Sequence, residues 1–196
     1  MVHFNGTEAQ PANQPELQQP ASRSAAIRLL ATLGITNPMT LPFRHSAGFG
    51  KRIEYWIVGL MLKQGMDVYL PLVDDDAIDA VIKRPDGNFV QVQIKARGKD
   101  IKPGDGALFS AITHDERLSY FFVFYSERHD KIWILSSLEF LKYSHQNKEG
   151  SNIGKRSIWL NGKRKNKLTG DPEEHIHERF NQFEAKNFDL SRLLAQ

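Results

Sequence analysis

One stretch of the sequence, residues 76–97, constrains the fold more than any other. It reads DAIDAVIKRPDGNFVQVQIKAR, in which a Pro-Asp-Gly unit separates two runs that are rich in β-branched residues. Pro favours the second position of a type I turn and Gly supplies the left-handed position that follows, so residues 84–88 predict a hairpin with a three-residue loop. We therefore expect antiparallel strands at 78–83 and 89–96.

The register of this hairpin separates two faces. Counting back from the turn, the opposed pairs are Arg84 with Asn88, Ala80 with Val92, and Asp79 with Gln93. Opposed residues project to the same side of a sheet, as do residues two apart on one strand. One face is then apolar and must pack on the core: Ile78, Ala80, Ile82, Val90, Val92, Ile94 and Ala96. The face expected to meet solvent carries Asp79, Val81, Lys83, Phe89, Gln91, Gln93 and Lys95.

Three polar residues of the second face gather at the end remote from the turn, and their chemistry suits a magnesium site. Mg²⁺ takes oxygen ligands in octahedral geometry, which Asp79, the Gln93 side-chain oxygen and the carbonyl of Ile94 offer. Lys95 is then placed to orient or deprotonate a water, or to stabilise charge on a phosphate. The alternative is a sheet face that is simply solvated.

Other segments supply the rest of an α/β pattern. Residues 53–64 predict a helix that ends at Gly65, and its apolar residues lie on nearly every side, so we expect burial on most faces. Further strands are expected at 68–72, 120–125 and 132–135. Ser136 and Glu139 have the spacing of a capping box, which predicts a helix to about residue 143. The secondary structure of residues 107–118 is ambiguous from the sequence, and a short helix is one option.

The order of these motifs resembles the PD-(D/E)XK nuclease superfamily. Members carry an acidic residue on a helix, then Asp on one strand, then Glu or Asp, any residue, and Lys on the next strand. The matching positions here are Glu54, Asp79 and the triplet Gln93-Ile94-Lys95. The resemblance covers residues 48–97, and the strands within 120–135 suit the remaining core. It implies an α/β fold with a restriction-endonuclease-like core, in which a central mixed β-sheet is flanked by helices.

The resemblance also implies a magnesium-dependent DNA endonuclease, with Mn²⁺ as a substitute metal. Asp79 and Gln93 would hold the metal together with the Ile94 carbonyl. Lys95 would assist the attacking water, and Glu54 would be an accessory metal or water ligand. Gln93 stands where members usually have a carboxylate, a variant known in some homing endonucleases of the superfamily. Three alternatives stay open: a catalytically inactive nucleic-acid- or partner-binding module, a nuclease acting on RNA, and a Glu54 that only favours the positive end of its helix.

Basic residues are concentrated in residues 148–167, with seven Lys or Arg against one Glu. Phosphate backbones attract such clusters through counterion release, although a solvated basic loop has the same composition. Asn161-Gly162 within 159–164 predicts a hairpin turn, and Asp171-Pro172 predicts the start of a C-terminal helix. On that helix His175 and His177 would point to different faces and make no metal pair. The cations expected to contact DNA are Lys51, Arg52, Arg97, Lys99, Lys155, Arg156, Lys163, Arg164, Lys165 and Lys167.

Composition limits the classes of protein and of site that the chain can form. The chain has 196 residues, 40% of them hydrophobic, and no cysteine, which excludes disulfides, thiolate metal sites and cysteine nucleophiles. Residues 1–22 are rich in Gln and Pro and lack Lys and Arg, which favours a flexible tail over a packed arm. A helix is expected at 22–33, and 23–196 is expected to form a single domain. No apolar run is long enough to span a membrane, so we expect a cytoplasmic protein. Its expected partner is double-stranded DNA, and cutting both strands favours a homodimer or higher homo-oligomer.

Overall fold

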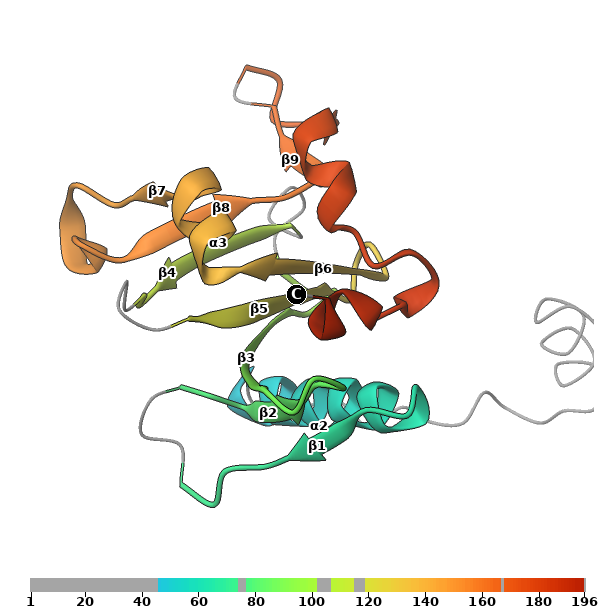
Figure 1. Cartoon of the computed structure of the whole chain (residues 1–196). Helices are drawn as coiled ribbons and strands as arrows, with labels where there is room; N and C mark the ends of the chain where they lie inside the picture. The colour runs from blue at the N-terminus through green and yellow to red at the C-terminus, as the bar shows by residue number, and fades with distance from the viewer. Residues whose placement is uncertain (1–45, 74–76, 102–106, 115–118, 167, 196) are drawn as a thin grey trace, which may run out of the picture. The chain divides into compact units, whose positions relative to one another are not determined.

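A mixed β-sheet organises the part of the chain that the computed structural model describes, which is residues 46–73, 77–101, 107–114, 119–166 and 168–195. The sheet has five strands in the order β1-β2-β3-β5-β6, and only the β3–β5 pair is parallel (Figure 1). The strands are β1 (Asp67–Tyr69), β2 (Ala80–Lys83), β3 (Phe89–Arg97), β5 (Tyr120–Ser126) and β6 (Lys131–Ser136). The predicted α/β class with a central mixed sheet is confirmed. The predictions for 1–22 and for the helix at 22–33 concern residues outside the described ranges.

The predicted hairpin is present in the predicted register. Ala80 pairs with Val92, and the backbone N–H of Arg84 donates to the Asn88 carbonyl at 2.8 Å. Gly87 adopts a φ of +87°, the left-handed conformation that the turn requires and that Gly accommodates without a Cβ penalty. Turn chemistry and alternating polarity therefore determine this part of the fold locally.

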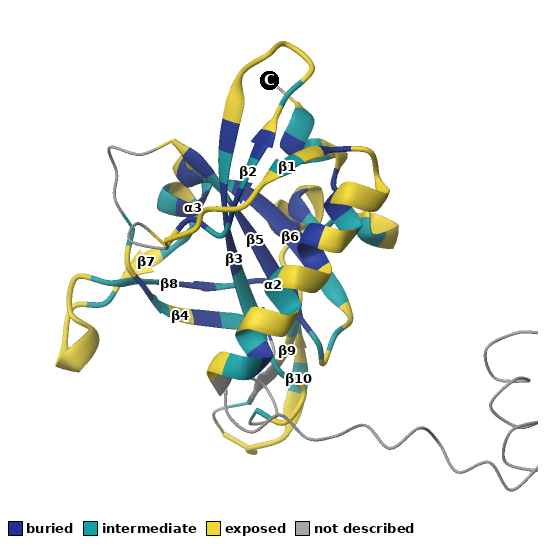
Figure 2. Ribbon diagram, turned by 90° about the horizontal axis from the view of Figure 1, so that it is seen from below, coloured by how far each residue is buried: buried dark blue, intermediate teal, exposed yellow. Residues whose placement is uncertain are grey.

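Both faces of the sheet are covered, each by its own hydrophobic cluster. On the first face, helix α2 (Ser46–Lys63) packs Ile57 and Met61 against Ala80 and Val92 of the hairpin. The second face is covered by helix α3 (Ser137–Tyr143) and by a three-stranded sheet in the order β4-β8-β7, whose strands are β4 (Leu108–Ile112), β7 (His145–Gln146) and β8 (Arg156–Trp159). Figure 2 shows burial along the middle strands. Burial on both sides explains why β5 is a continuous apolar run rather than an alternating one.

Helix α2 differs from its prediction in length and burial. It begins at Ser46 rather than at residue 53, and one side is exposed, with Tyr55 61% and Leu62 55% accessible. The expectation of burial on most faces was wrong because only one side of the helix meets the sheet. The earlier start also excludes the helix-dipole explanation for Glu54, since the first turn of α2 carries no acidic residue.

Around the middle of the chain one prediction is confirmed and one option is excluded. The Ser136–Glu139 capping box is present: the Ser136 side chain accepts the Glu139 N–H, and the Glu139 carboxylate accepts the Ser136 N–H. The short-helix option for 107–118 was wrong where the structure describes it, because Leu108–Ile112 form strand β4, which pairs with β8.

The last quarter of the chain is where local sequence signals fail. Strand β8 does not pair with β9 (Gly162–Lys165); β9 pairs instead with β10 (Pro172–His175), so the predicted hairpin at 159–164 was wrong. The helix predicted from Asp171 was wrong too, because β10 occupies its start. The chain then continues through short 3₁₀ helices: η2 (Glu178–Phe183), η3 (Lys186–Phe188) and η4 (Ser191–Leu194), with η1 (Gly150–Asn152) earlier. No helix among the described residues is long and apolar enough to cross a membrane.

Asn161-Gly162 is a corner between two sheets rather than a hairpin turn. The Asn161 side chain is buried and bonds to the Asn181 side chain and the His177 N–H, each at 2.8 Å. A Cβ on Gly162 would lie 2.7 Å from the His129 ring and 2.9 Å from the Ala107 side chain. The glycine is therefore required by close approach rather than by a left-handed backbone.

We expect Gly162→Ala to lower the free energy of unfolding by about 1–3 kcal/mol, because a methyl group there overlaps two side chains. Urea denaturation measures the effect. The matched control is Gly59→Ala in α2, where an added Cβ meets nothing within 4 Å, and where we expect a gain of about 0.5–1 kcal/mol from helix propensity. Equal midpoints for Gly162→Ala and the wild type would contradict the close-packing argument.

Candidate active site at the divergence of β2 and β3

Strand β3 extends beyond its neighbour β2, and the site lies where the two part. Among the described residues β2 pairs only with 89–92 of β3, whereas β5 pairs with 91–97. At the divergence the Asp79 N–H still donates to the Val92 carbonyl at 2.9 Å, and its carboxylate Oδ2 accepts the Ile94 N–H at 2.6 Å. The side chain thus replaces the missing strand backbone. Because the N–H and C=O of a strand residue point to the same edge, the Ile94 carbonyl also faces this edge.

Gln93 lies beside this junction and is buried, with 3% of its surface exposed. Its Nε2 donates to the Ala77 carbonyl at 2.7 Å, which fixes the amide orientation because a carbonyl needs a donor. Oε1 is consequently left buried without a hydrogen-bond partner. The prediction of a solvated face was wrong for Gln93, since Phe122 lies next to it in register and belongs to the second cluster.

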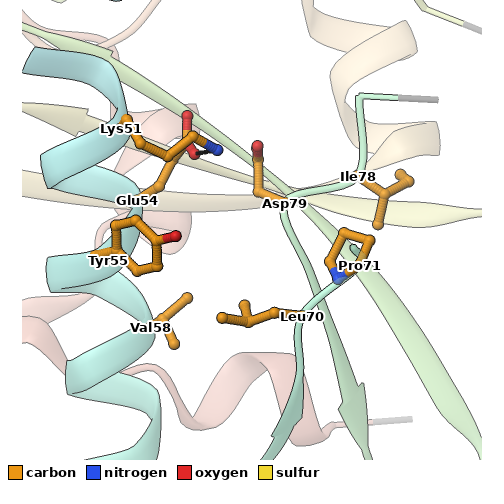
Figure 3. A pocket seen from close by; sticks show the side chains of 8 residues that line it. All are labelled: Lys51, Glu54, Tyr55, Val58, Leu70, Pro71, Ile78 and Asp79. Carbon is orange, nitrogen blue, oxygen red and sulfur yellow. Dashed lines mark ion pairs between the residues drawn. The ribbon is translucent and has the colours of Figure 1, made fainter. Parts of the chain in front are cut away.

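A cavity of about 60 Å³ opens between α2 and the start of the hairpin. In Figure 3 the side chains of Glu54 and Asp79 approach the same space from the helix and the strand. Lys51 forms an ion pair with Glu54 one turn away. The full lining is Lys51, Glu54, Tyr55, Val58, Leu70, Pro71, Ile78 and Asp79. A space of this size accommodates a few waters or a hydrated ion rather than an organic cofactor.

Two of the four predicted catalytic residues, Glu54 and Asp79, line one cavity. Ile94, the middle residue of the Gln93–Lys95 triplet, donates its N–H to the Asp79 carboxylate. Gln93 and the half-buried Lys95 are not among the residues lining the cavity. One placement differs from prediction: Ile78 is buried, but with the second cluster rather than with Ala80, because β2 begins only at Ala80 and Ile78 lies outside its alternating backbone.

The donor set offers oxygen ligands, which suit a hard cation rather than a metal that prefers nitrogen or sulfur ligands. No group of three His, Cys, Asp or Glu residues gathers anywhere in the described ranges. The oxygens offered are two carboxylates, the orphaned Gln93 Oε1 and the Ile94 carbonyl, which is the mixture of carboxylate and carbonyl ligands that Mg²⁺ accepts. The residues present therefore fit Mg²⁺ or Mn²⁺.

Sequence analysis missed the supporting parts of this site. Ala77 provides the carbonyl that anchors Gln93, and Leu70 and Pro71 form the far wall of the cavity. Nothing in the sequence around Ala77 signals its left-handed backbone, because the conformation arises where the chain enters β2. Tyr55 follows Glu54 directly, and its place on the cavity wall depends on the rotation of α2 about its own axis.

The predicted DNA-contacting cations occupy several different environments, and Arg97 is half-buried at the end of β3. Lys51, Arg52 and Lys99 are exposed near the site elements. Arg156 serves the structure, since its guanidinium donates to the Leu141 carbonyl and the Ser144 hydroxyl at the end of α3. On β9, Arg164 and Lys163 lie opposite Glu173 and Glu174 of β10. The prediction for Lys167 falls outside the described residues. Lys155 is half-buried, and the side chains of Arg164 and Lys165 are not described.

One smaller prediction concerns the same part of the chain. His175 and His177 were expected on different helix faces, but they lie on and just after β10 with ring centroids 4.5 Å apart. Trp159, the last residue of β8, is half-buried against the second cluster.

The loop after β3 is tied to the turn between β5 and β6. Glu127 Oε2 accepts the Lys99 N–H at 2.9 Å, and Arg128 donates to the carbonyls of Lys99 and Ile101. Burial raises the pKa of Tyr125, beside this turn, to about 12, and the negative charges of Asp130 and Glu127 add to the effect. Burial also lowers the pKa of His129 in the turn.

Comparison with known proteins gives a distant likeness to a solved structure. No protein family model and no curated protein matches the chain. Among solved structures it is similar to the bacterial homing endonuclease I-Ssp6803I, with a TM-score of 0.47 and 20% sequence identity over 73% of this chain and 91% of that chain. A likeness of this degree establishes neither a common fold nor a common activity.

We expect Asp79→Ala to destabilise the protein by about 1–3 kcal/mol, because it removes the acceptor of the Ile94 N–H. Asp79→Asn retains an acceptor oxygen and should therefore lose less stability than Asp79→Ala. Urea denaturation measures the stability of both variants. The control is Asp100→Ala at an exposed loop position, whose free energy of unfolding should stay within about 0.5 kcal/mol of the wild-type value. If Asp79→Ala matched that control, the carboxylate would not be holding the strand.

The raised pKa of Tyr125 predicts a loss of stability in alkali. The folded protein favours the neutral phenol, so this contribution is fully present below about pH 10, the ordinary tyrosine value, and is lost as the pH rises towards about 12. Chemical denaturation across pH 9–12 should show a steeper fall for the wild type than for Tyr125→Phe. Tyr55→Phe, at an exposed position, should keep the wild-type slope; equal slopes in all three would refute the assignment.

Proposed function

We propose that this protein is a divalent-metal-dependent DNA endonuclease that hydrolyses phosphodiester bonds. The observation that carries the proposal is the junction of β2 and β3. There the Asp79 carboxylate is held on the Ile94 N–H at 2.6 Å, and the adjacent Gln93 presents a buried oxygen without a partner. A buried acceptor that no protein donor satisfies is costly unless a ligand completes it.

In this proposal Asp79, Gln93 and the Ile94 carbonyl hold Mg²⁺ or Mn²⁺, and Glu54 is an accessory ligand. Such an ion lowers the pKa of a bound water and neutralises charge on the phosphate. The chain's own contribution is to preorganise the donors. Asp79 is fixed by a backbone bond, Gln93 is fixed by the Ala77 carbonyl, and Lys51 balances the charge of Glu54.

Lys95 completes the proposed site from the strand that carries Gln93. In the proposal its half-buried ammonium orients the attacking water or stabilises charge on the phosphate. Gln93 contributes an oxygen but no negative charge, so the metal should bind more weakly than at a site with a second carboxylate on β3. Activity is therefore expected to depend on metal concentration.

The proposed DNA contacts are Lys51, Arg52 and Lys99, which are exposed on the helix and the loop that adjoin the site. They supply charge for the phosphate backbone without reading sequence. Because we propose one such site in the described part of the chain, cutting both strands of a duplex requires two subunits or two binding events. We propose a homodimer or a higher homo-oligomer, which light scattering with and without duplex DNA tests.

The central test is cleavage of supercoiled plasmid DNA in Mg²⁺ or Mn²⁺. The wild type should nick or linearise the plasmid, and Asp79→Ala and Lys95→Ala should each lower the rate by about 100-fold or more. Lys186→Ala, which removes a cation of η3 outside the proposed site, should cleave at the wild-type rate. Equal cleavage by all variants would remove the catalytic assignment.

Calorimetric titration with Mn²⁺ separates an enzyme from a binding module of the same fold. The proposal predicts binding by the wild type and its loss in Asp79→Ala. Salt-sensitive DNA binding with neither Mn²⁺ binding nor cleavage would favour the binding module instead. Parallel assays on RNA and DNA of one sequence decide which nucleic acid is cut.

A further inference from the structure

Lys95 and Arg97 are two half-buried cations on one side of β3. They are separated by one residue, so their side chains leave the same face of the strand. In register they lie beside Phe124 and Ser126 of β5, neither of which supplies a negative charge. Two like charges two positions apart repel each other unless an anion lies between them or beside them.

Of these two cations, Arg97 has the more unusual environment. Its Nε is buried and has no hydrogen-bond partner, and neither Arg97 nor Lys95 takes part in an ion pair within the described part of the chain. A buried donor on a charged group is costly when it is left unpaired. Two other arginines of this protein have hydrogen-bond partners. Arg156 donates to groups at the end of α3, and Arg128 donates to two backbone carbonyls.

The acidic residue bonded to the same stretch of chain, Glu127, forms no ion pair with Arg97. Glu127 donates its backbone N–H to the Arg97 carbonyl, and its Oε2 accepts the Lys99 N–H at 2.9 Å. The carboxylate is thereby used to shape the loop after β3. Among the described residues no carboxylate forms an ion pair with Arg97, which lies at the end of the strand that carries the predicted catalytic triplet.

The end of β3 also adjoins the start of α2. A Cβ built on Gly98 would lie 3.7 Å from the Phe49 ring, which belongs to the first turns of the helix that bears Lys51 and Glu54. Figure 2 shows this end of β3 next to α2. The end of β3, where Arg97 lies, therefore adjoins the helix that bears Lys51 and Glu54.

From these contacts we propose that Arg97 is a catalytic residue whose guanidinium binds the non-bridging oxygens of the phosphate being cleaved. The inference rests on the proposed endonuclease function and assigns it a residue beyond the metal site. A planar guanidinium offers two parallel N–H donors that match two phosphate oxygens, which an ammonium group does not. Arg97 stays protonated throughout, forms no covalent bond, and stabilises the negative charge that grows on the phosphate during hydrolysis.

The test separates the chemical step from DNA binding. Single-turnover cleavage in Mg²⁺ at saturating DNA gives the rate, and fluorescence anisotropy in Ca²⁺ gives the affinity. Arg97→Ala should slow the rate by about 100-fold while changing the Kd less than about 3-fold, as the loss of one charge-stabilising donor does elsewhere. Arg97→Lys should recover only part of the rate. Added guanidinium ions should partly rescue Arg97→Ala and not Arg97→Lys.

Two further variants provide the comparison. Lys99→Ala removes an exposed cation two residues after Arg97. It should raise the Kd for DNA and reduce the salt dependence of binding by about one counterion, and it should affect the affinity more than the cleavage rate. Lys186→Ala should change neither measurement. Urea midpoints near the wild-type value exclude a folding defect; if Arg97→Ala does not fold, Arg97→Lys and its response to guanidinium decide the question.

A rate for Arg97→Ala within about 3-fold of the wild type overturns this inference and leaves the proposed function intact. A loss of affinity that matches or exceeds the loss of rate also overturns it, because Arg97 would then be an ordinary backbone contact. If the wild type itself cleaves no DNA in Mg²⁺ or Mn²⁺, the proposed function fails and the role of Arg97 fails with it.

Discussion

The arrangement of the site depends on one mismatch of length, since β3 continues for five residues after its pairing with β2 ends at Val92. A strand edge presents N–H and C=O groups that need partners. The Asp79 carboxylate satisfies the first of these groups at 2.6 Å, and the same bond places a negative charge on the open edge. A structural requirement of the sheet and a chemical requirement of the proposed site are thus met by one side chain. This is why Asp79→Asn and Asp79→Ala are not equivalent changes.

The amide at position 93 follows from burial on both faces of the sheet. Gln93 is 3% exposed, adjoins Phe122, and donates to the Ala77 carbonyl. A glutamate there would place a charge in an apolar surrounding and would turn an acceptor towards the Ala77 carbonyl, which is repulsive. The amide keeps an oxygen ligand and supplies the donor that the carbonyl needs. In physical terms Gln is the residue that this backbone accepts, and the consequence for the proposed function is a site with one negative charge fewer.

Sequence reasoning worked where structure is determined locally and failed where it is determined by distant partners. The Pro-Asp-Gly turn and the alternation around it specify the register of Ala80 with Val92, and the capping box at Ser136 needs only Glu139. The corner at Asn161-Gly162 carries a hairpin signal, but its glycine is required by the His129 ring and its asparagine by Asn181. Neither partner is visible in the local pattern. The burial of Gln93 escaped prediction for the same reason, because it depends on the second sheet and α3.

Charge illustrates the same limit and bears on where a nucleic acid would approach. Counted along the sequence, residues 148–167 are the most basic segment, yet β10 brings Glu173 and Glu174 opposite two of its cations. Lys163 forms an ion pair with Glu174 at 3.9 Å, so this ribbon attracts phosphate less than its composition indicates. Lys95 and Arg97 are only two charges, but they are half-buried and have no acid beside them in register on β5. In a medium that is less polar than water an uncompensated charge acts more strongly on a ligand than an exposed one. The phosphate is therefore expected to be drawn to the end of β3 rather than to the segment with more lysines.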